Sequence, residues 1–193
     1  MADSNKVVFG IKNCYYSPLT INSTTGTGAY TTPVALPGAV SLSMDAQGDT
    51  NKFYADNIVY YVSAANNGYE GTLELAKIPD DFLVDILGYI RDGSSVLVED
   101  AAAPVKHFAL TFQFEGDQHA RRHVLYNCTA SRPAISGSTI EDSVTPQTQS
   151  INISATTIFN AVLNKDVVKA SATPSESVAY NAWNTTIYQT AST

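Results

Sequence analysis

Residues 108–114, Phe108-Ala-Leu-Thr-Phe-Gln-Phe114, alternate strictly between large apolar side chains and smaller or polar ones. A period of two is the pattern of a half-buried β-strand, with one face in a core and the other at the surface. Gly116-Asp117 follows as a turn, and residues 122–129 (RHVLYNCT) supply a returning strand. We therefore predict a fold built on an antiparallel sheet around this hairpin.

A second hairpin is predicted between residues 58–63 (IVYYVS) and 69–75 (YEGTLEL). Asn67-Gly68 would form its tight turn, because an Asn-Gly pair accepts the positive φ angles of such a turn. On the second strand, Glu70 and Glu74 alternate with the leucines, so we expect one wet, acidic face. Further strands are expected at residues 6–12, 39–42, 95–99 and 150–155.

One helix is predicted to begin after Pro79. The acidic residues Asp80 and Asp81 suit its first turn, where carboxylates can accept hydrogen bonds from the free N–H groups, and Gly88 is placed to end it. The stripe that should pack on a sheet consists of Phe82, Leu83, Ile86 and Leu87. We expect Phe82→Asp to be ruinous and Asp85→Asn to be mild.

Two segments, residues 17–37 and the tail after Lys169, look unpaired because they are rich in Thr, Gly and Pro or in Ala, Ser and Thr. The tail nevertheless contains Tyr180, Trp183 and Tyr188, which suggests docking either on its own domain or on another subunit. We divide the chain into a β domain, residues 1–170, and a C-terminal arm, residues 171–193.

The composition restricts the class of protein. The chain of 193 residues is 15% charged with a net charge of −7, whereas soluble proteins average about 25% charged residues. Sparse charge suits surfaces that are desolvated in an assembly, and the negative sign argues against a nucleic-acid binder. No apolar run approaches a membrane span of ~20 residues and no signal peptide is evident, so we expect a chain made in a cytoplasm, with Cys14 and Cys128 reduced.

Catalytic chemistry finds no support in the sequence. His119 and His123 are four residues apart, but they fall in a hairpin region beside two arginines that would repel a metal ion. There is no Gly-x-Ser-x-Gly elbow and no phosphate-binding loop. We expect no enzyme, no metal and no cofactor.

An ordered series of motifs covers most of residues 39–190. It comprises residues 53–57 (FYADN), 67–71 (NGYEG), 73–76 (LELA), 78–82 (IPDDF), 126–133 (YNCTASRP), Glu141-Asp142, 146–154 (PQTQSINIS) and 180–183 (YNAW). In these motifs the chain resembles the major tail proteins, or tail tube proteins, of long-tailed phages and prophages of Gram-positive bacteria.

The resemblance implies a mainly β fold, a β-sandwich or split β-barrel of two antiparallel sheets with one flanking helix. It implies a virion protein, assembled in the host cytoplasm, that polymerises into stacked rings, usually hexamers, forming the tail tube. The implied partners are other copies of the chain, the tape measure protein, and the distal tail and tail terminator proteins. DNA would pass through without specific binding, and no membrane is involved. The chain is too short for the extra immunoglobulin-like domain of some relatives.

The resemblance also suggests roles for individual residues. Glu70 and Glu74 are candidates to face the lumen, although they could equally be solvent-facing charges on the outer wall. The segment 41–57 would contact adjacent subunits, with its tip at Gly48-Asp49-Thr50. The candidates for inter-ring or inter-subunit contacts are Gly48, Asp49, Thr50, Tyr54, Asp56 and Asn57, and those for docking of the C-terminal arm are Tyr180, Trp183 and Tyr188.

Two other classes stay open. Exposed Tyr, Asn and Thr also suit a carbohydrate-binding, adhesin-like β-sandwich, which would be a monomer. A hydrolase accessory domain would need a convergent pair of perturbed carboxylates in a cleft.

Overall fold

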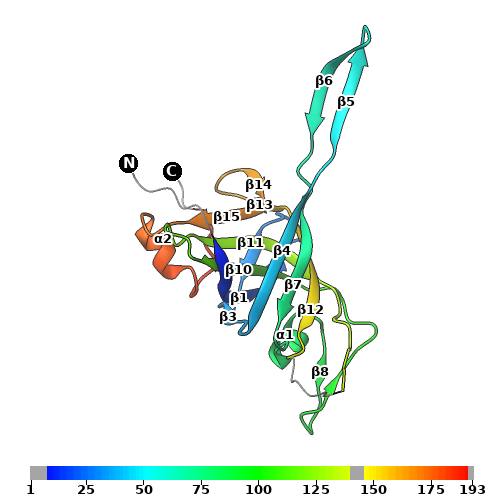
Figure 1. Ribbon diagram of the computed structural model, residues 1–193, viewed down its shortest axis with the longest axis vertical. Helices are drawn as coiled ribbons and strands as arrows, with labels where there is room; N and C mark the ends of the chain where they lie inside the picture. Colours follow the sequence, from blue (N-terminus) through cyan, green and yellow to red (C-terminus); the bar gives the residue numbers. More distant parts are fainter. Residues whose placement is uncertain (1–7, 140–145, 191–193) are drawn as a thin grey trace.

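The computed structural model describes residues 8–139 and 146–190. It is a mainly antiparallel β protein, as predicted, and it has two short helices where one was predicted (Figure 1). Residues 6–7 of the first predicted strand, and Glu141-Asp142 of the motif series, lie outside the described residues. The strands are β1 (Phe9–Ile21), β2 (Gly28–Tyr30), β3 (Val34–Ala35), β4 (Ala39–Gln47), β5 (Thr50–Ala55), β6 (Ile58–Ala64), β7 (Gly68–Leu75), β8 (Ile90–Arg91), β9 (Leu97–Val98), β10 (His107–Glu115), β11 (Arg122–Ala130), β12 (Gln149–Thr156), β13 (Ile158–Asn160), β14 (Lys165–Val167) and β15 (Lys169–Ala172). The helices are α1 (Asp80–Asp85) and α2 (Ser177–Ala182).

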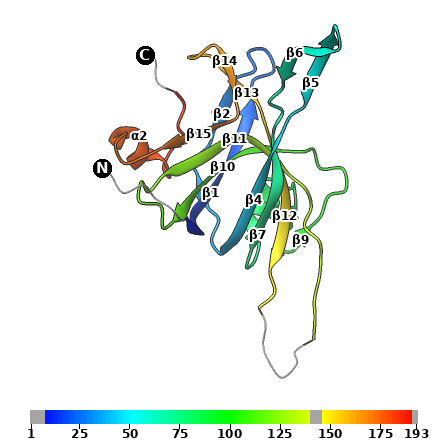
Figure 2. The ribbon, with the colours of Figure 1, turned by 45° about the horizontal axis from the view of Figure 1, so that its top comes forward.

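Nine strands form one sheet in the order β2-β1-β10-β11-β12-β7-β4, with β3 added to β1 and β15 to β11. The sheet curls so that β4 returns to the neighbourhood of β1 without hydrogen-bonding to it, which is the geometry of a split barrel (Figure 2). Three two-stranded ribbons, β5-β6, β8-β9 and β13-β14, extend from this body.

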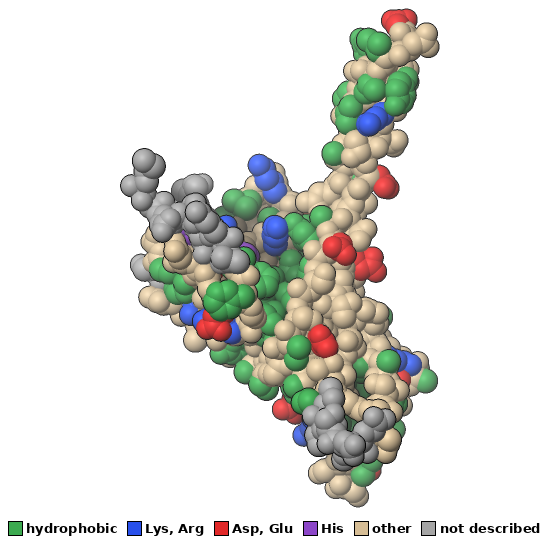
Figure 3. Space-filling view, viewed as in Figure 1, with side chains coloured by type: hydrophobic (Ala, Val, Ile, Leu, Met, Phe, Trp, Pro, Cys, Tyr) green, Lys and Arg blue, Asp and Glu red, His purple; other side chains and the backbone are tan. Residues whose placement is uncertain are grey.

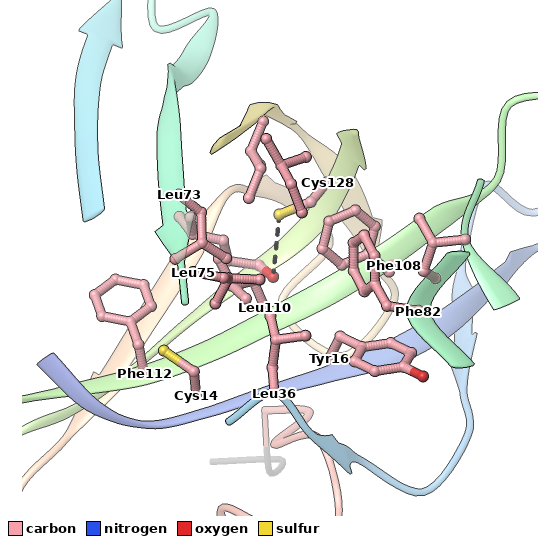
Figure 4. Close-up of a cluster of buried hydrophobic side chains, with 14 of the residues drawn as sticks. Cys14, Tyr16, Leu36, Leu73, Leu75, Phe82, Phe108, Leu110, Phe112 and Cys128 are labelled. Atoms are coloured by element: carbon pink, nitrogen blue, oxygen red, sulfur yellow. Dashed lines mark hydrogen bonds between the residues drawn. The ribbon is translucent and has the colours of Figure 1, made fainter. Parts of the chain in front are cut away.

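The main core lies inside the curl and is closed by α1. The ring of Phe82 meets those of Tyr16 and Phe108 edge-on, at centroid distances of 5.0 and 5.6 Å (Figure 4). Phe82 and Ile86 are buried and Leu83 and Leu87 pack against the same core, so the predicted apolar stripe is confirmed. The helix ends at Asp85, earlier than predicted, although Gly88 does have a positive φ of +75°. The predicted capping is wrong: no side chain caps the first turn of α1.

The hairpin of β10 and β11 is confirmed, but the prediction that β10 is half-buried is wrong. Both of its faces are covered from Phe108 to Gln113. The second face packs in a separate apolar cluster, where Ala109 lies with Trp183 and Ile187 from the C-terminal segment. A face of small and polar residues can be buried when a distant segment supplies the large side chains.

The predicted unpaired segments also differ from the structure. β1 continues through residues 17–21 and pairs with both β2 and β3, while the tail contributes β15 and α2. A buried hydroxyl helps to fix this region, since Ser17 Oγ donates a hydrogen bond of 2.6 Å to the carbonyl oxygen of Thr31. The strands predicted at 39–42 and 150–155 are confirmed within longer strands, and the one at 95–99 shrinks to β9.

Both cysteines are free and buried. Burial raises the pKa of the Cys14 thiol to about 12 and raises that of Cys128 as well. They therefore act as apolar core side chains, and their predicted reduced state is confirmed.

Candidate functional site

The most prominent feature is a β-ribbon that leaves the body as a long projection (Figures 1 and 2). We call β5 and β6, with their turn, the projecting hairpin (residues 50–64). It continues β4 and β7 without a break, because Ala65 N donates to Asp49 O at 3.0 Å and Asn67 N to Gln47 O at 2.9 Å. It is therefore an extension of two body strands and not a separate loop.

The tip of the projecting hairpin is a two-residue turn at Asp56-Asn57. Their φ angles of 52° and 62°, between the paired residues Ala55 and Ile58, correspond to a type I′ turn. The predicted tip at Gly48-Asp49-Thr50 is wrong, since Gly48 and Asp49 lie at the base of the hairpin. Of the other inter-subunit candidates, Thr50 and Tyr54 lie in β5, and Asp56 and Asn57 form the turn.

The predicted pairing of residues 58–63 with residues 69–75 is also wrong. β6 pairs with β5, and β7 pairs with β4 and β12. Gly68 does have a positive φ, +98°, but it lies at the start of β7, where the ribbon joins the body, and a Cβ there would lie 1.9 Å from the carbonyl oxygen of Ala155. The Asn-Gly pair correctly predicted a positive φ angle at Gly68. It wrongly predicted that a hairpin turn lies there.

Large apolar side chains cover both faces of the projecting hairpin. Each is between 45% and 72% exposed, Tyr60 most of all. The set comprises Phe53, Tyr54, Ile58, Val59, Tyr60, Tyr61 and Val62. An isolated two-stranded hairpin is marginal in water, and a contiguous exposed apolar surface of this kind is typical of an interaction site.

Sequence reasoning missed Phe53, Tyr60 and Tyr61 as a surface, although a signal was present. The run Ile58-Val-Tyr-Tyr-Val62 does not alternate with polar residues, so neither of its faces can be the wet face of an ordinary strand.

A second feature is a polar sheet face across β4, β7 and β12. Strand register aligns nine side chains in three rows, with β7 in the middle of each. The rows are Ser41-Glu74-Ser150, Ser43-Thr72-Asn152 and Asp45-Glu70-Ser154. We call these nine residues the polar face. It carries three carboxylates and no Lys or Arg, and Figure 3 shows acidic side chains spaced over the tan surface of β4 and β7.

Glu70 and Glu74 both belong to the polar face, so the predicted acidic side of β7 is confirmed. Ser41 Oγ donates to Glu74 Oε2 at 2.8 Å, and the Thr148 hydroxyl donates to Oε1. These hydrogen bonds, Thr148 first, lower the pKa of Glu74, so the carboxylate stays charged at neutral pH. The tight approach of β4 to β7 requires Gly71, where a Cβ would lie 1.8 Å from Ser43 O.

The third feature is an open apolar hollow on the other side of β4 and β7. We call it the hollow; it measures about 390 Å³, and its principal lining residues are Met44, Tyr69, Phe112, Phe114, His123 and Lys169. In Figure 3 hydrophobic side chains fill its floor and basic side chains stand at its edge. No local pattern could reveal it, because its walls come from strands far apart in the sequence.

His123 in the hollow predicts a pH dependence. Its ring stacks on Phe112 at 5.2 Å, and burial, followed by the positive charges of Arg121 and Lys169, lowers its pKa. The unfolded chain, with a His pKa of about 6.5, then binds more protons than the folded chain as the pH falls. The free energy of unfolding should therefore be constant, as far as His123 is concerned, above about pH 6.5, and it should decrease as the pH falls toward the pKa of His123 in the folded protein. His123→Phe should flatten this decline in thermal melts between pH 7.5 and 5.

The matched control is His119→Gln, because His119 is exposed. It should keep the slope of the parent protein. Equal slopes for His123→Phe and the parent would contradict the prediction. Carboxylates such as Glu74, with its lowered pKa, lose their contribution only below about pH 4.5 and so fall outside this window.

The C-terminal arm docks on the chain's own body. Arg122 lies 4.0 Å above the Tyr180 ring and donates to the Tyr180 carbonyl, and the Tyr180 hydroxyl donates to Ala120 O at 3.0 Å. Trp183 is 2% exposed, donates from Nε1 to His123 O at 3.2 Å and stacks on Tyr188. A role of this arm between subunits stays a proposal and would use its outer surface.

Within residues 8–139 and 146–190, no three His, Cys, Asp or Glu side chains gather as metal ligands. In the same part of the chain, neither helix is long and apolar enough to cross a membrane.

No protein-family model matches the sequence, and no curated relative matches it. Among solved structures, the chain is similar to one from the tube-terminating cap of the anti-feeding prophage, at 14% identity and a TM-score of 0.44, covering 89% of this chain and 97% of that one. A chain of the six-fold symmetrised baseplate of the same particle gives 8% identity, a TM-score of 0.44 and the same coverage. Similarity this distant assigns no role, so function is inferred from the surfaces described above.

Proposed function

We propose that the protein is a structural, non-enzymatic phage tail protein that polymerises, as stacked hexameric rings, into the tail tube. The projecting hairpin carries this proposal. Its apolar side chains are exposed on both faces, and burying them in a neighbouring subunit would gain about 25 cal/mol per Å² of apolar surface. In a monomer the apolar side chains of this extension stay in water and add no stability, whereas in an assembly they can be buried.

The edge of the sheet supports the same proposal. β4 is the last strand in the sheet order, so the backbone groups on its outer side have no ladder partner among the described strands. An open edge is a template for pairing with another chain, and closure of a ring removes every such edge. Edge-to-edge pairing of copies would turn the split barrel of each subunit into part of a larger one.

The polar face fits the wall of a conduit. Glu70 and Glu74 are our candidates to face the lumen, together with Asp45 from the neighbouring strand. A surface of hydroxyls, amides and carboxylates without cations offers DNA phosphates no anchor, so the cargo would slide. The partners would be further copies of the chain, the tape measure protein in the lumen, and the distal tail and tail terminator proteins at the ends.

Removing the apolar character of the projecting hairpin tests the proposal. The triple variant Phe53→Ser, Tyr60→Ser and Tyr61→Ser should fold, because these residues lie outside both apolar clusters, and should fail to assemble. Circular dichroism should show an unchanged body. Sedimentation velocity and negative-stain microscopy should show a monomer where the parent forms rings or tubes.

A matched control replaces three exposed apolar residues elsewhere, Val105→Ser, Ile135→Ser and Val178→Ser. It should assemble like the parent. Normal tubes from the hairpin variant would contradict the role given to the hairpin. A parent protein that stays monomeric over a wide concentration range would reject the tail proposal and favour the carbohydrate-binding alternative.

A further inference from the structure

The hollow is apolar and open, and residues 8–139 and 146–190 leave it uncovered. Its floor is largely aromatic: Phe112, Phe114 and His123 contact one another, with ring centroids 5.2 to 5.8 Å apart. Apolar side chains at an open mouth of the core gain stability when another surface covers them. The volume of about 390 Å³ is enough to hold one or two large side chains of a partner.

The electrostatics of the hollow are opposite to those of the chain as a whole. The protein carries a net charge of −7, yet the charged residue lining the hollow is Lys169, whose Nζ lies 4.7 Å from the centroid of the Tyr69 ring. In addition to burial, the positive charges of Arg121 and Lys169 both lower the pKa of His123, and they outweigh the opposing effect of the negative charge of Asp117. The hollow therefore favours an occupant that brings aromatic surface and a negative charge.

The projecting hairpin has both properties. Tyr60 is the most exposed aromatic side chain in it, at 72%, and Asp56 is the charged residue of its tip. The hairpin cannot fill the hollow of its own chain, because its strands continue β4 and β7 and point away from the body (Figures 1 and 2). Turning it back would break the hydrogen bonds at Asp49 and Gln47.

We propose that the hollow of one copy receives the projecting hairpin of a second copy. Tyr60 packs on the aromatic floor beside Phe112 and Phe114, and Asp56 pairs with Lys169. This inference rests on the proposed function and specifies the receiving surface. Since donor and receiver are different surfaces, the contact is head-to-tail, and repetition of such a contact gives a ring or an open filament.

Cysteine cross-linking tests the contact directly. Met44→Cys places a thiol in the hollow and Tyr60→Cys places one on the hairpin, while the natural cysteines are buried with raised thiol pKa values. Under mild oxidation the double variant should give a ladder of covalent multimers. An equal mixture of the two single variants should give dimers only, and each single variant alone should give none.

The control combines Tyr60→Cys with Val178→Cys, which puts a thiol on α2 at a position more exposed than Met44. It should give no ladder. Tubes seen by microscopy without the Met44–Tyr60 ladder would overturn this inference and leave the proposed function standing. Absence of any assembly by the parent would overturn both. Dimers from Tyr60→Cys alone would overturn the head-to-tail arrangement.

A charge exchange gives a second readout that does not depend on cysteine chemistry. Lys169→Glu should raise the critical concentration for assembly by about tenfold or more, since it sets like charges against each other at the contact. Adding Asp56→Lys should restore assembly toward that of the parent. If the double variant assembles no better than Lys169→Glu alone, the proposed pairing of these residues is wrong.

Discussion

Phe82→Asp is expected to leave no folded protein at 25 °C. The ring is fully buried between Tyr16 and Phe108, and its loss alone costs about 3–5 kcal/mol. The new carboxylate would lie in an apolar core without a cation, which adds several kcal/mol. The sum approaches the whole stability of a typical domain, about 5–15 kcal/mol. Circular dichroism and the solubility of the expressed protein measure the effect.

The matched control is Phe53→Asp, the same change at a side chain that is 62% exposed in the projecting hairpin. It should fold, because its carboxylate stays in water. Asp85→Asn is a second control on α1. Asp85 accepts a hydrogen bond of 2.9 Å from the Tyr16 hydroxyl, and an asparagine oxygen can still accept it, so the loss should be small. A soluble, cooperatively melting Phe82→Asp protein would refute this account of the core.

Trp183→Ala is expected to destabilise the monomer by about 3–5 kcal/mol, the range for truncating a large buried aromatic residue. The substitution removes the stack on Tyr188 and the hydrogen bond to His123 O, and it opens the second apolar cluster beneath β10 and β11. The melting temperature should fall by about 10 °C. Urea denaturation must be carried out at a concentration where the parent is monomeric, so that subunit contacts do not contribute.

Val178→Ala serves as the comparison for Trp183→Ala, since Val178 lies in the same helix region at 86% exposure. Its effect should stay within about 0.5 kcal/mol. A Trp183→Ala monomer with the stability of the parent, combined with a loss of assembly, would mean that the C-terminal arm acts between subunits.

The sequence predicts those parts of the fold whose signal is local. The alternation of residues 108–114 identifies β10 as a strand but not the burial of its second face, whereas the spacing of Phe82 and Ile86 identifies both α1 and its buried face. The alternation of Glu70 and Glu74 likewise predicts the acidic side of β7. These predictions need only the geometry of a single strand or helix.

Pairing over long distances is what the sequence does not reveal. Residues 58–63 have the same strand propensity whether they pair with β5 or with β7, and only the type I′ turn at Asp56-Asn57 decides between them. The contact of Arg122 with Tyr180 joins residues 58 positions apart, so composition alone left the C-terminal arm looking unpaired. The hollow could not be predicted for the same reason, since the residues that line it come together only after the sheet has curled.

The continuity of the projecting hairpin with β4 and β7 also determines how the subunit would carry load. A pull on the tip along the hairpin axis passes into β7, which pairs with β12 through seven residues from Tyr69 to Leu75. That ladder is loaded along its length, so its hydrogen bonds share the force and do not open one after another. The hairpin is thus anchored in the last two strands of the sheet, β7 and the edge strand β4, and tension between subunits would load their hydrogen-bond ladders in shear.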